Sequence, residues 1–326
     1  MAATRLTNVI VPEVFTPYTI EQSAVRSNLL QSGLVSSNPA LNQLASGGGS
    51  TFNLPFFKDL TGDSEIIEDN TALTVNALDG NQSQIGVALN RAKSFGSSFL
   101  SQYVSGEDPM RVIGDLVADY WVREEQKIVA KILQALFVSS GPLNSTHLND
   151  QGASALTNTM LIDAIAKIGD AYDKLSTIVC HSAIYHSLRK LDLVQYVQEP
   201  SNLPFQFPTY MGMNILVDDG VYSATDSTGT PATAYHTYIF AAGAFSRGVG
   251  TLDADDATEV DRDSLKSEDV LINRRRYIMH PNGFKWVGSA SGSSPTNAEL
   301  ATATNWSKVY DDKNIPVVAL NSRVSA

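Results

Sequence analysis

The residues best suited to nucleophilic chemistry are Cys180, His181 and His186. A thiol activated by a neighbouring imidazole is the working pair of cysteine hydrolases, so this cluster raises the hypothesis of a hydrolase that uses Cys180. The two groups must meet in space, whereas neighbouring side chains on a strand point to opposite faces. Because Cys180 and His181 end an apolar run typical of a strand, the sequence favours a structural cysteine followed by a turn that caps a helix.

The candidate metal ligands do not have the spacing of a known metal site. The acidic run from Asp253 to Asp263 suggests calcium, but an EF-hand loop needs Gly at its sixth position and Glu at its twelfth. Counting from Asp253 gives Thr258 and Ser264 instead. The remaining histidines stand singly, at His147, His236 and His280. We therefore expect no metal and no cofactor, and we expect the acidic run to be solvated or to pair with basic residues of another subunit.

Two further patterns resemble nucleotide-binding or nucleic-acid-binding motifs only in part. The glycines at 47–49 have the composition of a phosphate loop, but no Lys-Ser or Lys-Thr follows and no strand precedes them. The basic cluster NRRRY spans 273–277, and on a strand its arginines alternate between faces. We therefore predict no catalytic residue. We predict that three arginines form charge pairs across an interface between subunits: Arg274, Arg275 and Arg276.

The stretch SGGGSTFNLPFFKDL, residues 46–60, joins a glycine run to an apolar strand. Glycine maximises backbone freedom, while large apolar side chains need a surface to bury against. A hydrophobic arm on a glycine joint is typical of a chain that reaches onto its neighbours. The sequence predicts that four of its side chains contact a neighbouring subunit: Phe52, Leu54, Phe56 and Phe57.

Composition sets the limits within which these residues act. With 326 residues, 43% hydrophobic and 17% charged, the chain has the content of two folded domains or of one large sheet-containing unit. A net charge of -11 argues against a nucleic-acid-binding surface, which needs clustered Lys and Arg. A single cysteine excludes an internal disulfide and indicates a reducing cytoplasm. No apolar run approaches the roughly 18 residues of a membrane helix.

The elements that position these residues follow from periodicity. Residues 1–46 contain scattered prolines and no sustained period, which predicts an extended N-terminal arm with a short helix near 20–30. Segments 51–60 and 82–100 have strand patterns and predict one long two-stranded excursion. Asp108 as N-cap, Pro109 at the first helical position, and apolar residues three and four apart predict one helix of about 30 residues over 107–137.

The rest of the chain alternates between helix and strand patterns. Helices are expected at 157–175 and 182–193, and strands at 176–181, 212–219 and 237–248. Two long strands, around 257–263 and 268–288, precede a short helix near 298–303 and a final strand at 314–320. This order predicts a mixed α/β region inserted between the long helix and the return strands.

The order of these parts resembles the major capsid protein of tailed double-stranded DNA bacteriophages, which has the Hong Kong 97 fold. Its most specific features lie in the C-terminal third, in EVDRD, RRRYIMHPNGFKW and ATNWSKVYDDKNIPVVAL. The resemblance implies an α+β fold in four parts: an N-terminal arm (1–46), an extended β-loop over a neighbouring subunit (47–105), a peripheral domain with the long spine helix (106–140 and 256–326), and an axial α/β domain (141–255).

The same resemblance implies a function and partners. The chain would self-assemble into the hexamers and pentamers of an icosahedral shell that encloses double-stranded DNA without sequence-specific binding. A portal protein would be a partner, with separate scaffolding and decoration proteins left open, and no membrane. The subunit would be assembled in the cytoplasm of the host bacterium and found in the virion. An encapsulin-like cellular nanocompartment is the alternative with the same fold, and a cysteine hydrolase is the alternative of another class.

Overall fold

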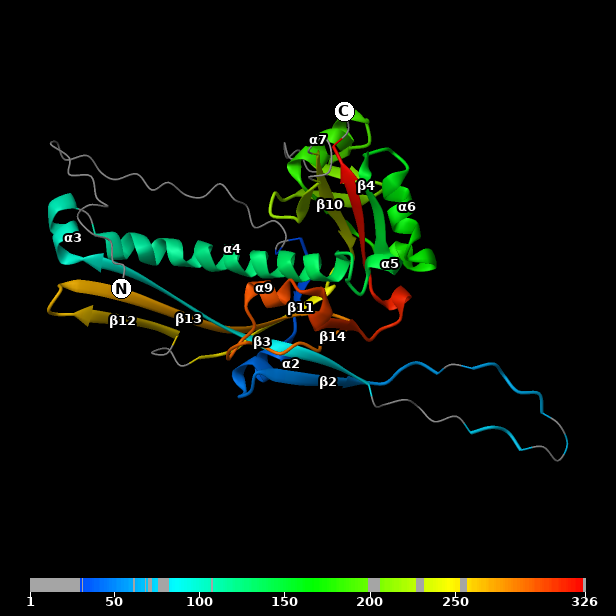
Figure 1. The fold of residues 1–326 in the computed structure, drawn as a ribbon, viewed down its shortest axis with the longest axis horizontal. Helices are drawn as coiled ribbons and strands as arrows, with labels where there is room; N and C mark the ends of the chain where they lie inside the picture. The colour runs from blue at the N-terminus through cyan, green and yellow to red at the C-terminus, as the bar shows by residue number, and fades with distance from the viewer. Residues whose placement is uncertain are drawn as a thin grey trace.

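The computed structural model consists of two large β-sheets, one long helix between them and an extended hairpin (Figure 1). It describes residues 30, 32–60, 62–67, 69, 72–75, 82–106, 108–198, 206–226, 232–252 and 257–324. The helix expected near 20–30, apart from its last residue, lies outside the described residues, as do residues 1–29 of the expected arm.

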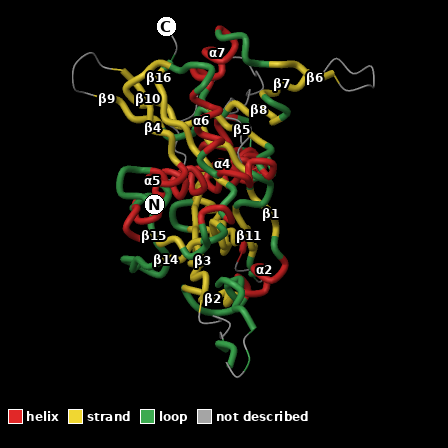
Figure 2. The backbone as a smooth tube through the Cα atoms, turned by 90° about the vertical axis from the view of Figure 1, so that its right-hand side faces the viewer, coloured by secondary structure: helices red, strands yellow, loops and turns green. Residues whose placement is uncertain are grey.

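The long helix α4 spans Pro109–Phe137 and has 29 residues. It begins where the sequence predicts, because Asp108 Oδ1 accepts a hydrogen bond from Met110 N at 3.0 Å and Pro109 occupies the first turn. Its deeply buried residues begin at Trp121 and continue to Phe137. This C-terminal half passes between the two sheets (Figure 2). The predicted helix over 107–137 is confirmed.

The first sheet contains the hairpin and the arginine-rich strand. Its order is β1 (Val35–Ser37), β11 (Phe245–Val249), β13 (Glu268–Pro281), β3 (Gln82–Ser98) and β2 (Thr51–Phe56), and β12 (Thr258–Asp263) also pairs with β13. β3 runs antiparallel both to β13 and to β2. Helix α2 (Pro39–Ser46) packs on β11 and β13, and α3 (Phe99–Ser105) follows the end of β3.

The second sheet carries most of the mixed region. Its order is β4 (Leu148–Ala155), β16 (Val317–Arg323), β10 (Ala232–Phe240), β5 (Thr177–Cys180), β8 (Met213–Val217), β7 (Gln206–Tyr210) and β6 (Gln195–Gln198), and β9 (Ser223–Asp226) also pairs with β10. The helices α6 (Met160–Ala166), η2 (Gly169–Lys174) and α7 (Ser182–Lys190) contribute to the core of this half.

Short elements connect the two halves. They are α5 (Asn144–His147), β14 (Phe284–Trp286), α9 (Asn297–Leu300), η3 (Ala303–Asn305), β15 (Trp306–Lys308) and η4 (Asp312–Asn314). The largest core cluster joins the end of α4 to strands of both sheets, with Phe137 packed against Tyr238 at a ring-centroid distance of 5.7 Å. Because burial of apolar area drives folding, this shared core fixes the helix against both sheets.

The strand predicted at 237–248 is wrong, because this segment forms two strands in different sheets. β10 ends at Phe240 and belongs to the second sheet, while β11 begins at Phe245 and belongs to the first. Between them, Gly243 has φ 75°, a conformation that favours glycine. Because the apolar run is continuous, the sequence does not indicate where the chain passes from one sheet to the other.

The described part of the expected arm is folded. β1 and α2 occupy 35–46, where the scattered prolines had predicted an extended segment. Pro39 stands in the first turn of α2, and Asn38 Oδ1 accepts a hydrogen bond from Ala40 N at 3.0 Å. Proline is tolerated in the first turn because its missing N–H has no partner there, so Pro39 starts a helix rather than preventing one.

Two further boundaries differ from the expectation. Phe99 and Leu100 begin α3 rather than ending a strand, and Gly169, with φ 68°, separates α6 from η2 where one helix was predicted. Two strands also join a different sheet from the one that their expected domain would give them. β16 lies in the second sheet although the peripheral segment 256–326 contains it, and β11 lies in the first sheet although the axial segment 141–255 contains it.

Candidate assembly surfaces

Phe52 at the base of the hairpin is buried within its own subunit. Its exposed fraction is 8%, and its cluster contains Leu41, Ala45, Ala88 and Ile278. The paired residue on β3 is Gly86, where a Cβ would lie 2.0 Å from Phe52 Cζ. The prediction that a neighbouring subunit buries Phe52 is therefore wrong, because the folded helix α2 and the first sheet already cover the ring.

Leu54 and Phe56 are partly buried in the same subunit. Leu54 packs on the Phe52 cluster, and the Phe56 ring meets Tyr310 edge-on at a centroid distance of 4.9 Å. Tyr310 Oη accepts a hydrogen bond from Gln84 Nε2 at 2.6 Å. The base of the hairpin is thus fixed to the C-terminal segment, and Phe57, with 71% of its surface exposed, is the one of the four predicted residues left open.

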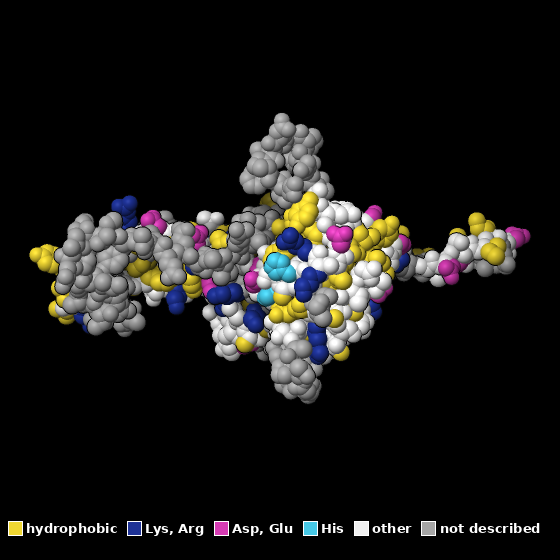
Figure 3. Space-filling model, turned by 90° about the horizontal axis from the view of Figure 1, so that it is seen from above, with side chains coloured by type: hydrophobic (Ala, Val, Ile, Leu, Met, Phe, Trp, Pro, Cys, Tyr) yellow, Lys and Arg dark blue, Asp and Glu magenta, His cyan; other side chains and the backbone are white. Residues whose placement is uncertain are grey.

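Beyond Phe56, the described residues of 57–75 form neither helix nor strand and expose large hydrophobic side chains. We call these side chains the loop patch: Phe57, Leu60, Ile66, Ile67, Leu73 and Val75. Acidic residues lie among them, at Asp59, Asp63, Glu65 and Asp69. Figure 3 shows hydrophobic and acidic side chains together on this protruding end of the molecule. A hydrophobic patch rimmed by polar residues is typical of a protein interaction site.

A second exposed hydrophobic surface lies at the opposite end of the long axis. Phe99 N donates a hydrogen bond to Ser267 O at 2.8 Å, which joins α3 to the turn between β12 and β13 (Figure 1). We call its exposed side chains the tip patch: Phe99, Leu100, Tyr103, Val260 and Leu265. The subunit therefore presents apolar contacts at both of its ends.

The three arginines of β13 make contacts within the subunit. Arg274 Nη2 lies 3.0 Å from Glu259 Oε2 on β12, and Arg276 Nη2 donates a hydrogen bond to Gly49 O at 2.7 Å. Arg275 points to the other face, toward α4. These contacts lie within the subunit, and the charge pairs across an interface stay a prediction. The contact of Arg276 also fixes the glycine run, since Gly49 has φ 106° and its carbonyl is held by Arg276.

The carboxylate of Glu125 on α4 is buried and forms ion pairs with two arginines of the first sheet. Its side chain is 5% exposed, and its carboxylate lies 2.9 Å from Arg247 Nη2 and 3.5 Å from Arg275 Nη1. The Arg275 guanidinium also stands 5.2 Å from the centre of the Trp121 ring. Sequence reasoning missed Glu125, because the run REEQK on a helix has the composition of a solvent-facing surface.

The prediction that Cys180 is a buried structural residue is confirmed. Burial raises the pKa of the Cys180 thiol to about 12, so the thiol stays protonated near neutral pH. His181 is the N-cap of α7: its Nδ1 accepts a hydrogen bond from Ala183 N at 3.1 Å, and its Nε2 lies 3.6 Å from Asp219 Oδ1. The imidazole is therefore engaged by the helix and by Asp219, not by the thiol.

The described residues present few other groups that could do chemistry. That part of the chain holds no group of three or more His, Cys, Asp or Glu side chains that could bind a metal ion. Nor does any helix there have the length and hydropathy to span a membrane. Three acidic residues of the suggested calcium run, Asp253, Asp255 and Asp256, lie outside the described residues.

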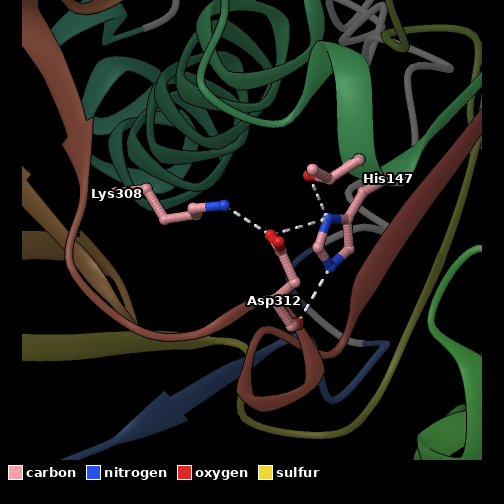
Figure 4. Close-up of polar contacts among 4 residues, drawn as sticks. His147, Lys308 and Asp312 are labelled. Atoms are coloured by element: carbon pink, nitrogen blue, oxygen red, sulfur yellow. Dashed lines mark hydrogen bonds and ion pairs between the residues drawn. The ribbon is translucent and has the colours of Figure 1, made fainter.

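A buried histidine connects α5 to the C-terminal segment (Figure 4). His147 Nδ1 lies 2.8 Å from Thr146 Oγ1 and 3.7 Å from Asp312 Oδ1, and its Nε2 lies 3.0 Å from the Asp312 carbonyl oxygen. Lys308 Nζ is 2.5 Å from the same Asp312 carboxylate. Burial lowers the pKa of His147 despite these oxygens. The cluster joins α5 to β15 and η4 and has the geometry of a structural contact.

The chain matches known proteins along its length. A model of the Gp13-like family, described as major capsid protein 13-like, matches residues 104–318. The chain is 38% identical over 331 residues to the major capsid protein of Bacillus phage SPP1, with 100% of both chains covered.

Solved structures share the fold at low identity. The capsid of Ralstonia phage GP4 is 12% identical with a TM-score of 0.62, covering 97% of this chain and 96% of that chain. The head of Helicobacter pylori bacteriophage KHP40 is 11% identical with a TM-score of 0.58, covering 100% and 98%. The SrpI encapsulin complex of Synechococcus elongatus is 11% identical with a TM-score of 0.56, covering 95% and 93%. With the family match and the full-length relative, the chain belongs to the Gp13-like family of phage major capsid proteins, and its fold is the α+β Hong Kong 97 fold.

Proposed function

We propose that this protein assembles into the hexamers and pentamers of an icosahedral shell around the double-stranded DNA of a tailed phage. The observation that carries the proposal is the loop patch. Six large hydrophobic side chains are exposed on a segment that projects from the subunit. Each such side chain stabilises by roughly 1.5–3 kcal/mol when fully buried, and a neighbouring subunit is the surface that a projecting loop reaches.

The form of this contact favours rings. A loop at one end of a subunit that binds a different surface of the next copy makes a heterologous contact, and such contacts close into rings when the rotation between copies allows. The same contact repeated with small changes of angle gives rings of five and six. Phe52 and Arg276 fix the base of the hairpin. The residues beyond Phe56 would therefore adjust when the angle between neighbouring subunits changes.

The charge of the chain supports enclosure of DNA without tight binding. A net charge of -11 gives the shell little affinity for phosphates, because counterion release requires clustered Lys and Arg. DNA would then be held by confinement and by its own counterions. Empty shells are expected to bind duplex DNA weakly, and a steep loss of binding with salt would contradict this account of the charge.

The remaining assignments extend the proposal. A portal protein is expected as partner, with scaffolding and decoration proteins as candidates, and assembly is expected in the cytoplasm of the host bacterium. The division into an arm (1–46), an extended loop (47–105), a peripheral domain (106–140 and 256–326) and an axial domain (141–255) is kept as a proposal, with β11 and β16 exchanged between the last two because of the sheets they join.

An encapsulin-like compartment is the second candidate function. It is favoured by the fold shared with the SrpI encapsulin complex at a TM-score of 0.56. Phage shells enclose nucleic acid, whereas an encapsulin of this kind would enclose protein. The contents of purified particles separate the two.

A cysteine hydrolase has no support from the geometry at Cys180, because the thiol is buried and the His181 imidazole accepts a hydrogen bond from Ala183 N instead. The experiment that tests the proposed function is expression of the full chain followed by electron microscopy and nuclease-protection analysis of sedimented particles. Closed shells, and protected DNA in particles from infected cells, are expected. Soluble monomers at high concentration would contradict assembly, and small shells filled with a cargo protein would favour the encapsulin.

A further inference from the structure

A pocket of about 380 Å³ lies at an interruption of the first sheet. β13 pairs with β12 up to Asn273 and with β11 from Tyr277 onward, so these two strands occupy opposite ends of β13 (Figure 1). Among the described residues, neither strand pairs with β13 at positions 274–276. The pocket therefore lies beside the part of β13 that carries its three arginines.

Arginine dominates the lining of this pocket. Arg275 points toward α4, and its neighbours Arg274 and Arg276 alternate to the other face of β13. Arg247 of β11 shares the carboxylate of Glu125 with Arg275, so it lies on the α4 side. The lining residues include Glu125, Arg247, Arg274, Arg275, Arg276 and Tyr277. The pocket thus collects guanidinium groups from both faces of the sheet.

The guanidinium groups around the pocket outnumber the carboxylates. Glu125 forms ion pairs with two of the four arginines, and Glu259 pairs with a third. Within the described residues, Arg276 forms no ion pair, and its Nη2 donates to the uncharged carbonyl of Gly49. Four positive groups against two negative ones leave an excess of two positive charges in this part of the structure. In a chain with a net charge of -11, this excess is a local exception.

Three buried donor groups of the lining have no hydrogen-bond partner among the described residues: Arg247 Nε, Arg276 Nε and Tyr277 Oη. Tyr277 is 1% exposed, and burial raises the pKa of its hydroxyl, so the group stays protonated and donates at neutral pH. A buried donor without a partner is destabilising. A ligand rich in acceptor oxygens supplies the missing partners.

We propose that this pocket binds an oxyanion of the phosphate class. The planar guanidinium group is matched to such ligands, because it donates two parallel hydrogen bonds to two oxygens of one anion. Arg276 provides the charge that no carboxylate balances, while Glu125 holds Arg247 and Arg275 in place. A phosphate group carries a charge of about -1.5 to -2 near neutral pH, which matches the local excess. The site lies within one subunit, so the inference goes beyond the proposed function and does not depend on assembly.

Calorimetric titration of the purified full-chain subunit with inorganic pyrophosphate, at fixed ionic strength, measures this binding. Arg276→Gln is expected to raise the Kd about tenfold or more, because it removes a charged donor from the pocket. Arg276→Lys keeps the charge without the fork of donors and is expected to weaken binding less. Arg262→Gln is the matched control with wild-type Kd, because this exposed arginine of β12 lies outside the lining and pairs with Asp269.

Thr258→Glu gives a second test that leaves every arginine in place. Thr258 is an exposed residue of the lining, so a carboxylate there competes with the anion for the guanidinium groups. The Kd is expected to rise about tenfold or more. Val260→Glu, an exposed position of the same strand outside the lining, is the matched control with wild-type Kd. Circular dichroism verifies that each variant is folded.

A short DNA duplex added as competitor identifies the source of the phosphate. Displacement of pyrophosphate by the duplex assigns the site to backbone phosphates of a nucleic acid, and no displacement assigns it to a free phosphate compound. A wild-type subunit that binds no pyrophosphate, or an equal Kd for the wild type, Arg276→Gln and Thr258→Glu, would overturn the proposal. Because the titration uses unassembled subunits, a failure to form shells would contradict the proposed function and leave this result standing.

Discussion

Gly86 and Phe52 are paired at the base of the hairpin, where a Cβ at position 86 would lie 2.0 Å from Phe52 Cζ. The ring thus covers the backbone of the paired strand and closes the cluster between α2 and the first sheet. This contact fixes where the hairpin leaves the subunit. The projecting loop beyond it is therefore presented from a rigid base.

Gly86→Ala is expected to destabilise the subunit by about 1–3 kcal/mol, because the methyl group forces the Phe52 ring out of its position. Thermal unfolding of the unassembled subunit measures the change. Gly48→Ala is the matched control, since a Cβ there meets nothing within 4 Å. Equal melting temperatures for the two variants would show that the ring moves without cost.

Phe52→Ala is expected to lower the stability of the subunit, whereas Phe57→Ala is expected to weaken assembly. Phe52 is 8% exposed, so its loss should cost the subunit about 3–5 kcal/mol. Phe57 is 71% exposed, so its loss should leave subunit stability unchanged and weaken assembly. Denaturant unfolding of subunits and of particles separates the effects. If Phe57→Ala particles resist denaturant as well as wild-type particles do, Phe57 is not part of an assembly surface.

Glu125→Gln is expected to destabilise the subunit by about 1.5–3 kcal/mol, because it removes the carboxylate that Arg247 and Arg275 share while both guanidinium groups keep partial access to water. Glu124→Gln is the matched control on the adjacent position, where the pair with Lys127 is largely solvent-exposed and contributes about 0–1 kcal/mol. Urea unfolding provides both values. Similar midpoints for the two variants would contradict a structural role for the buried ion cluster.

Subunit stability is expected to fall as the pH falls from about 6.5 to about 4, through two buried histidines. Burial lowers the pKa of His236 and of His280 to about 4, so the folded state keeps both neutral. The unfolded chain binds these protons near pH 6.5, and each histidine then contributes a loss of up to about 1.4 kcal/mol per pH unit within that window. Below the folded pKa the contribution levels off.

The measurement is the pH dependence of the free energy of unfolding for the wild type, His236→Asn and His280→Asn. Each variant is expected to have a shallower slope than the wild type between pH 6.5 and pH 4, whatever its absolute stability. Because carboxylates titrate in all three proteins, the difference between slopes isolates the histidine. An unchanged slope for His280→Asn would contradict a neutral His280 in the folded state.

The sequence was sufficient to predict the long helix and β12 with most of β13, but the strand predicted at 268–288 is divided at Asn282 and Gly283 into β13 and β14, which lie in different sheets. Asp108 and Pro109 provide local start signals, and the alternation through β12 and β13 lies within one stretch of chain. Such features depend on neighbours in sequence, so they can be inferred without knowing the tertiary contacts. The same holds for Cys180, whose burial follows from an apolar strand.

The rest depends on contacts between distant residues. Phe52 is buried because α2, from a segment with no clear period, folds over it. Glu125 is buried because Arg247 and Arg275 arrive from strands more than a hundred residues away. Among the described residues, β2 pairs with β3 only from Gln82 to Val87. None of these pairings leaves a local signal, which is why the sequence did not predict the burial of Phe52 within its own subunit or the contact of Arg275 with Glu125.

The central claim is that the subunit assembles through its loop patch. The most direct measurement is parallel electron microscopy of the wild type and of a variant in which the six loop-patch residues, Phe57, Leu60, Ile66, Ile67, Leu73 and Val75, are replaced by Ser. The account predicts closed shells for the wild type and folded, unassembled subunits with unchanged circular dichroism for the variant. Intact shells from the variant, or a wild type that remains monomeric under the same conditions, would contradict it.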